Sequence, residues 1–109
     1  MDEKEINRML IHFERLFREA NKTYINPKID ELTVDDLAPI VNMVAKSRAE
    51  YLRYVYDLGK KFGDNGEFPS ADELKKLKVL RMRFNEVAEG SLAFETCIQR
   101  GYLDLKVDV

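Results

Sequence analysis

Several residue types that build common functional sites are scarce in this chain. The 109 residues include one cysteine, one histidine and no tryptophan. A single cysteine excludes an internal disulfide and a zinc site built from cysteines. A lone thiol is typical of a reducing compartment, so we expect a cytoplasmic protein. The first ten residues are acidic and have no apolar core, so the sequence predicts no signal peptide.

Long apolar runs and a dominant charge are also missing. No stretch approaches the ~20 apolar residues that a membrane helix needs, so we expect no membrane span. The chain carries 18 basic and 20 acidic residues, a net charge of −2, which makes no overall case for nucleic acid or for an anionic membrane. Hydrophobic residues nevertheless make up 45% of the chain, which favours one folded, soluble domain over a disordered chain.

Glycine and proline are few, and they separate three segments with helical periodicity. We predict helices over about 2–22, 36–62 and 71–100, joined by a connector over 23–35 and a turn over 63–70. Three residue pairs have the spacing of helix-start caps: Asp2 with Glu5, Thr33 with Asp36, and Ser70 with Glu73. Because proline fits only a first helical turn, Pro39 places the start of the second helix near Asp36.

The first helix has one apolar face, from Ile6 to Ala20, whereas the second is apolar around most of its girth. A heptad seam runs along the second helix through Leu37, Val41, Val44, Arg48, Tyr51, Val55, Leu58 and Phe62. We expect this helix to be central, with Arg48 as a buried polar residue that specifies register or partner choice. A buried arginine needs a carboxylate, and Glu14, Glu86 and Glu95 are the candidates. The alternative is that Arg48 reaches water.

The third helix has a second seam, through Leu77, Leu80, Phe84, Val87, Ser91, Phe94 and Ile98. Its register passes through Gly90 unbroken, which predicts one continuous helix ending at Gly101. An extended tail over 102–109 follows, with apolar residues at every second position. It would pair with the 24–32 connector, a second copy or a ligand chain, or else drape over the helices.

Residues 62–73, "FGDNGEFPSADE", have the rhythm of a calcium-binding loop around Gly66. In that register Lys61 and Gly63 occupy positions that need carboxylate oxygens, so the ligands are missing. The same residues suit a helix-to-helix turn, with Gly63 left-handed and Asn65-Gly66 forming a tight turn. We therefore predict a connection and no ion site.

Other chemistry has weak support. Glu86 and Glu89 have the spacing of paired metal-ligating carboxylates, which leaves a divalent-metal helical enzyme as one alternative. His12 and Cys97 would have to meet in space to form a nucleophilic site. A second alternative is nucleic-acid binding through a basic end around residues 60–83, with contacts from Lys60, Lys61, Lys75, Lys76 and Lys78.

The fold class that we predict is all-α: three long helices in an antiparallel bundle with a short extended C-terminal segment, completed by dimerisation. The apolar surplus favours a non-enzymatic interaction protein, such as an adaptor, a regulator or a small subunit of an assembly, without a cofactor or metal. We expect the partner to be a second copy or another protein. The predicted interface is Tyr51, Tyr54, Tyr56, Val79, Met82, Ala93 and Cys97.

Overall fold

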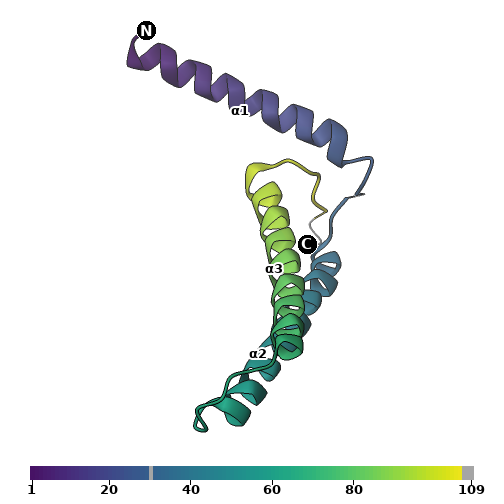
Figure 1. Ribbon diagram of the computed structural model, residues 1–109. Coiled ribbons are helices and arrows are strands. Elements are labelled where there is room, and N and C mark those ends of the chain that lie inside the picture. The colour runs from purple at the N-terminus through teal and green to yellow at the C-terminus, as the bar shows by residue number, and fades with distance from the viewer. Residues whose placement is uncertain (30, 107–109) are drawn as a thin grey trace. The chain divides into compact units, whose positions relative to one another are not determined.

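The computed structural model describes residues 1–29 and 31–106, and its regular elements over those residues are α-helices (Figure 1). They are α1 (Glu3–Ile25), α2 (Val34–Phe62) and α3 (Ala71–Arg100). The all-α prediction is confirmed, and the predicted helix boundaries agree to within three residues.

The chain divides into two compact units, each with its own packing. The hairpin unit is Ala38–Leu92, which contains most of α2 and α3 and the turn between them. The junction unit combines Met1–Leu37 with the chain from Ala93 onward, and therefore contains all of α1.

The helix starts are set by the predicted caps. Asp2 Oδ1 accepts the Glu5 amide at 2.9 Å, and this bond satisfies one of the free N–H groups of the first turn of α1. Ahead of α2, Thr33 and Asp36 bond reciprocally, each amide donating to the other side chain. The Thr33 amide is the main reason that the pKa of the Asp36 carboxyl lies below its ordinary value, because it stabilises the charged form.

Pro39 lies farther inside α2 than the sequence predicts. The helix begins at Val34, two residues before the predicted start near Asp36, so Pro39 falls in its second turn and not in its first. Proline has no N–H to donate to the carbonyl four residues earlier. The reciprocal Thr33–Asp36 cap nevertheless defines the helix start, and the helix continues through the proline.

Within the hairpin unit, α2 and α3 lie side by side and run in opposite directions (Figure 1). Lys61 pairs with Glu73 at 3.0 Å close to the turn, and Glu50 pairs with Arg83 at 3.2 Å farther along. The Tyr51 and Phe84 rings stack across the contact, 6.2 Å between centroids and 14° from parallel. These contacts between α2 and α3 make up the tertiary packing of the hairpin unit.

The contact face of α3 matches its predicted seam, whereas that of α2 matches in part. Every member of the α3 seam from Leu77 to Ile98 is half-buried. On α2 the seam members Val41, Arg48 and Val55 are exposed, and Ser47, which is not a member, is buried. The other members of the α2 seam are buried or half-buried: Leu37, Val44, Tyr51, Leu58 and Phe62. The Ser47 hydroxyl donates to the Val44 carbonyl at 2.9 Å, which satisfies its hydrogen-bonding group inside the contact.

The turn between α2 and α3 is built from local hydrogen bonds. Asn65 Oδ1 accepts the Glu67 amide at 3.0 Å, and Gly66 has φ +72°, a left-handed conformation that favours glycine. The left-handed residue is thus Gly66, and the expectation of a left-handed Gly63 is wrong. Ser70 and Glu73 then cap α3 reciprocally, as predicted.

The junction unit joins the connector to the C-terminal segment. Leu32 and Leu105 form an isolated parallel bridge, in which the Leu32 amide donates to the Asp104 carbonyl and the Lys106 amide to the Leu32 carbonyl. Pairing with the connector, one of the partners considered for the tail, is therefore what occurs. Leu32 and Leu103 are the buried core of this unit, 5% and 4% exposed. The end of the tail, 107–109, lies outside the described residues.

Polar contacts fasten the end of α1 to the same segment. Asn26 and Asp104 bond twice, through the Asn26 side-chain amide to the Asp104 carboxylate at 3.0 Å and through the Asp104 amide to Asn26 Oδ1 at 3.2 Å. Lys22 lies 3.7 Å from the same carboxylate. The segment is brought back by Gly101, whose φ of +69° ends α3 as predicted, with the Tyr102 amide bonded to the Cys97 carbonyl.

Candidate interaction surfaces

The apolar face of α1 is uncovered within its own unit. We call the α1 stripe the six large side chains on this face, each 44% to 60% exposed: Ile6, Met9, Leu10, Phe13, Leu16 and Phe17. None of the first twenty residues of the chain is buried. A face this apolar on an amphipathic helix normally packs against another element.

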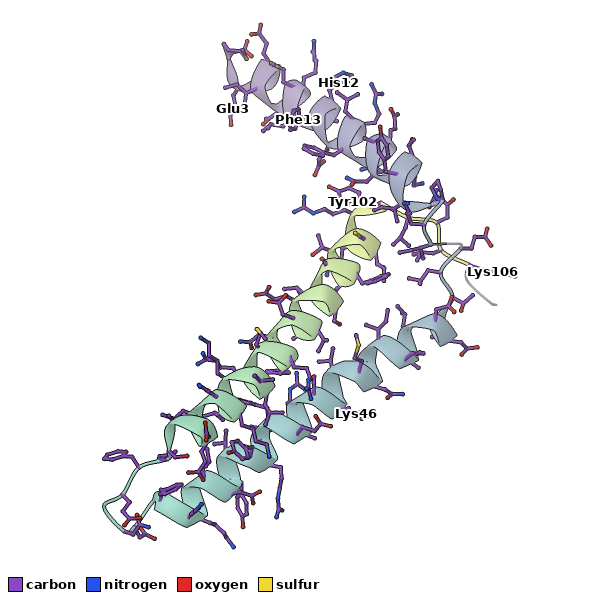
Figure 2. All side chains as sticks on the ribbon, turned by 45° about the vertical axis from the view of Figure 1, so that its right-hand side comes forward. Glu3, His12, Phe13, Lys46, Tyr102 and Lys106 are labelled. Atoms are coloured by element: carbon purple, nitrogen blue, oxygen red, sulfur yellow. The ribbon has the colours of Figure 1, made fainter. Side chains whose placement is uncertain are left out.

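The α1 stripe is hollowed, and its borders are acidic. Residues Ile6, Met9, Leu10 and Phe13 line an open depression of about 390 Å³ together with Met1. Phe13 (Figure 2) contacts Phe17 edge to face, with 4.9 Å between the ring centroids. At helical spacing the carboxylates fall toward the borders of the stripe, and Lys4, Arg15 and Lys22 fall on the opposite side. Arg8 lies nearer, and it lines an open depression with Met9, His12 and Phe13. We call Glu3, Glu5, Glu14 and Glu19 the acidic rim.

A second exposed apolar surface runs along α2, beside the face that meets α3. We call it the α2 stripe: Val41, Ala45, Leu52, Val55 and Tyr56. Its four larger side chains are 41% to 59% exposed. Arg53 and Lys60 both lie over the Tyr56 ring, 5.6 and 5.2 Å from its centroid. The helical spacing places Arg48 within this stripe, between Val41 and Val55, and places Arg53 and Lys60 beside its Tyr56 edge, so that edge is basic.

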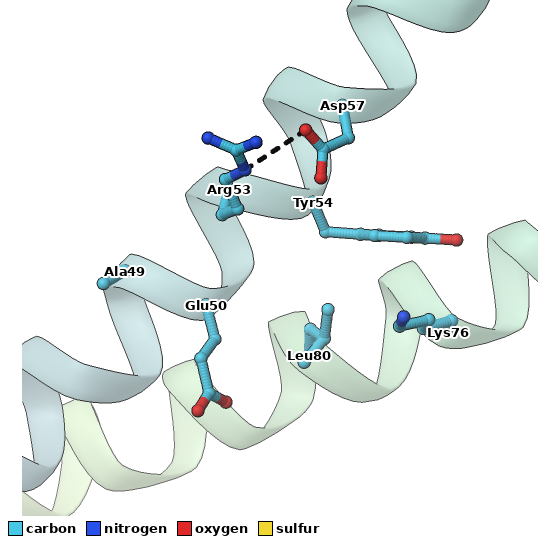
Figure 3. Close-up of a pocket in the computed structure, with 7 residues that line it drawn as sticks. All are labelled: Ala49, Glu50, Arg53, Tyr54, Asp57, Lys76 and Leu80. Atoms are coloured by element: carbon cyan, nitrogen blue, oxygen red, sulfur yellow. Dashed lines mark ion pairs between the residues drawn. The ribbon is translucent and has the colours of Figure 1, made fainter.

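A groove on the hairpin unit encloses about 480 Å³ and is lined from both helices (Figure 3). Tyr54 from α2 and Leu80 from α3 contribute apolar surface, and Lys76 lies 4.7 Å from the centroid of the Tyr54 ring. Arg53 pairs with Asp57 at 3.2 Å on the groove wall (Figure 3). Of the other charged lining residues, Glu50 pairs with Arg83, which lies outside the lining, and Lys76 faces the Tyr54 ring.

The predicted interface residues fall in three places. Tyr51 and Tyr54 are half-buried in the hairpin's own contact, whereas Tyr56 lies on the α2 stripe. Val79 and Met82 are exposed on α3, 46% and 55%. The last two, Ala93 and Cys97, belong to the junction unit, where Ala93 is exposed and Cys97 is half-buried.

Arg48 is exposed in the single chain, and its guanidinium lies over the Phe84 ring, 5.1 Å from the centroid. It is therefore not buried by the chain's own fold, and the residue that the hairpin buries is its neighbour Ser47. Among the ion pairs of the described residues none involves Arg48. The carboxylate expected for Arg48 thus has to come from elsewhere, or water solvates the guanidinium.

The candidate nucleic-acid contacts are partly engaged already. Lys61 pairs with Glu73, Lys60 lies over Tyr56, and Lys76 lies over Tyr54. Lys75 and Lys78 are exposed on α3. The pairing of Lys61 also lowers the pKa of the Glu73 carboxyl, after the larger effect of the Ser70 amide. This end of the hairpin unit is therefore less positive than the count of lysines indicates.

The residues considered for catalysis or metal binding do not form a recognisable site. Glu86 and Glu89 are exposed, and no cluster of three or more histidine, cysteine, aspartate or glutamate side chains able to hold a metal occurs within residues 1–29 and 31–106. His12, labelled in Figure 2, bonds to the Arg15 side chain three residues along α1, at 2.9 Å. The metal-enzyme alternative stays a prediction without a described ligand set.

Two features escaped the sequence analysis. The Asn26–Asp104 pair spans 78 residues, and no local pattern signals it. The exposed stripe on α2 could have been recognised, because its members recur at three, four and seven positions, but the same residues also fitted a buried seam.

In the described part of the chain, no helix has the length and apolarity to cross a membrane. Comparison with known proteins found no matching family model, curated protein or solved structure.

Proposed function

We propose that the chain is a small, non-enzymatic helical interaction protein that works as a homodimer and acts through the apolar faces of its helices. The observation that carries this proposal is the α1 stripe, with six large apolar side chains about half exposed on one face. Such a surface favours association with another apolar face. The α2 stripe, with Val79 and Met82 on α3, adds further apolar surface.

Rough energies support a dimer over a single small contact. Covering the exposed half of each α1 side chain contributes about 1 kcal/mol, or about 6 kcal/mol for the stripe. Association costs about 4–15 kcal/mol, so one such contact is close to break-even. In a two-fold dimer each contact occurs twice, which raises the favourable total to about 12 kcal/mol.

The acidic rim favours a protein partner over a lipid surface. Amphipathic helices that lie on anionic membranes carry lysine and arginine beside their apolar face. On α1 the acidic rim flanks the stripe, and of the basic residues Arg8 lines a depression with members of the stripe, whereas Lys4 and Arg15 are on the far side. The same polarity points to a partner whose apolar surface has a basic border.

Light scattering after size-exclusion chromatography tests the proposal directly. The wild-type chain has a mass of 12.8 kDa, and the proposal requires a species of twice that mass at micromolar concentration. Leu16→Lys on the stripe should shift the protein to monomer. The control is Ile11→Lys, the same change at a residue that is 68% exposed on α1 but lies off the stripe, and it should leave the mass unchanged. A wild type that is monomeric throughout would remove the proposal.

A further inference from the structure

The α2 stripe is long enough to cover the whole α1 stripe. The α1 stripe runs from Ile6 to Phe17 and the α2 stripe from Val41 to Tyr56, which are 11 and 15 positions (17 − 6 and 56 − 41). At about 1.5 Å per residue the two surfaces are about 17 and 23 Å long. Each is contiguous, apolar and exposed within its own unit.

The borders of the two stripes have opposite charge. Beside the α1 stripe lie the glutamates of the acidic rim, all exposed. Within the α2 stripe lies Arg48, and beside its Tyr56 edge lie Arg53 and Lys60, all three exposed; Arg53 also pairs with Asp57. On α1, Lys4 and Arg15 lie on the far side of the helix from the stripe, whereas Arg8 lies nearer and lines a depression with Met9 and Phe13.

We propose that the α1 stripe of one copy packs on the α2 stripe of a second copy, and that the two copies exchange these helices reciprocally. The inference rests on the proposed homodimer and names the surfaces that make it. A partner for α1 must present an apolar helix with a basic border, and α2 of a second copy has both properties. The same contact brings carboxylates of the acidic rim, including Glu14, to the exposed Arg48, whose guanidinium lies over the Phe84 ring and takes part in none of the ion pairs of the described residues.

The two-fold arrangement has a chemical consequence that can be tested. Every interface in the dimer joins an acidic rim to a basic border, so reversing either border alone places like charges together in both contacts. Reversing the acidic rim in one chain and the basic border in another restores opposite charges in both contacts of a mixed dimer. This complementarity does not depend on the direction in which the helices cross.

The experiment uses two full-length variants, Glu14→Lys with Glu19→Lys, and Arg48→Glu with Arg53→Glu. Each variant alone should dimerise at least about tenfold more weakly than wild type, because like charges oppose each other across the interface. An equimolar mixture should form the heterodimer, detected by native mass spectrometry through the distinct masses of the two variants. Circular dichroism of each variant checks that the helices are retained, and 1 M salt should reduce both effects by screening.

The outcomes separate the two proposals. Heterodimer recovery in the mixture, with both variants weakened alone, supports the exchanged α1–α2 contact. If the wild type is dimeric but both variants dimerise normally, or the mixture does not recover, this contact is wrong while the homodimer stands. If the wild type is a monomer at every concentration, the homodimer and the contact are both wrong. A matched control, Lys4→Glu with Arg15→Glu on the far side of α1, should leave dimerisation unchanged.

Discussion

Replacing Leu103 by alanine tests whether the junction unit is held by its small core. Leu103 is 4% exposed and packs in a core whose other buried residue is Leu32. The change removes three carbon groups, which at about 0.8 kcal/mol each lowers the free energy of unfolding of the unit by about 2.4 kcal/mol. A residual cavity would add to this loss. We therefore expect a destabilisation of about 2–4 kcal/mol.

Leu105 supplies a matched control two residues away. It is 46% exposed, so the same change to alanine there removes about half as much buried surface and should cost about 1 kcal/mol. The measurement is hydrogen exchange of the Leu32 and Lys106 amides, which donate across the bridge, together with urea unfolding followed by circular dichroism. A loss of about 2.4 kcal/mol corresponds to exchange about 50-fold faster in Leu103→Ala. An effect of Leu103→Ala no greater than that of Leu105→Ala would refute a core centred on Leu103.

Three further predictions concern the helix ends. Ser70→Ala removes the side-chain half of the α3 cap and should lower the stability of the hairpin unit by about 1 kcal/mol in thermal melts, whereas Ser70→Thr should retain most of it. Glu73→Gln should be less stable than wild type at neutral pH, because the lowered pKa of Glu73 means that the folded state favours the carboxylate. The difference in stability between wild type and Glu73→Gln should be complete above the ordinary pKa of glutamate, and it should disappear as the pH falls through the lowered pKa of Glu73 in the folded state. A difference in stability that persists in acid would contradict this prediction. Gly101→Ala should destabilise by about 1 kcal/mol because φ is +69°, while Gly90→Ala, which has open space in the helix interior, should stabilise by a similar amount. Equal shifts at the two glycines would refute this reasoning.

The proposed interfaces depend on features that the sequence contains but does not place. The α1 stripe is visible as a period of three and four residues, yet a buried bundle helix and an exposed interface helix have the same pattern. Among the described residues of the junction unit, none packs over this stripe closely enough to bury its side chains. Whether a face meets its own chain or a partner is a property of the packing, and periodicity does not record it.

The second helix shows where a small angular error changes the chemistry. Arg48 and Ser47 point about 100° apart around the helix, but the predicted and observed faces share Val44, Tyr51 and Leu58, so the face as a whole turns by about half that angle. The sequence favoured Arg48, because Val41 and Val55 continue its spacing. The structure turns Ser47, Tyr51 and Tyr54 toward α3 and leaves Val41, Arg48 and Val55 accessible. The stacked Tyr51 and Phe84 rings fit this rotation.

The sequence by itself determined the number of helices, their limits and their caps, because each depends on residues within about four positions of one another. Asp2 and Ser70 cap the first turns of α1 and α3, and Gly101 ends α3, as their local patterns predict. Only the tertiary structure decided which side of α2 meets α3 and which residue the tail pairs with. Leu32 and Leu105 are 73 positions apart (105 − 32). The period-two pattern of the tail indicates an extended segment, but it does not select the connector from the possible partners. Which distant segments pair depends on how all the apolar surfaces of the chain pack together, and the pattern within one segment does not specify its partner.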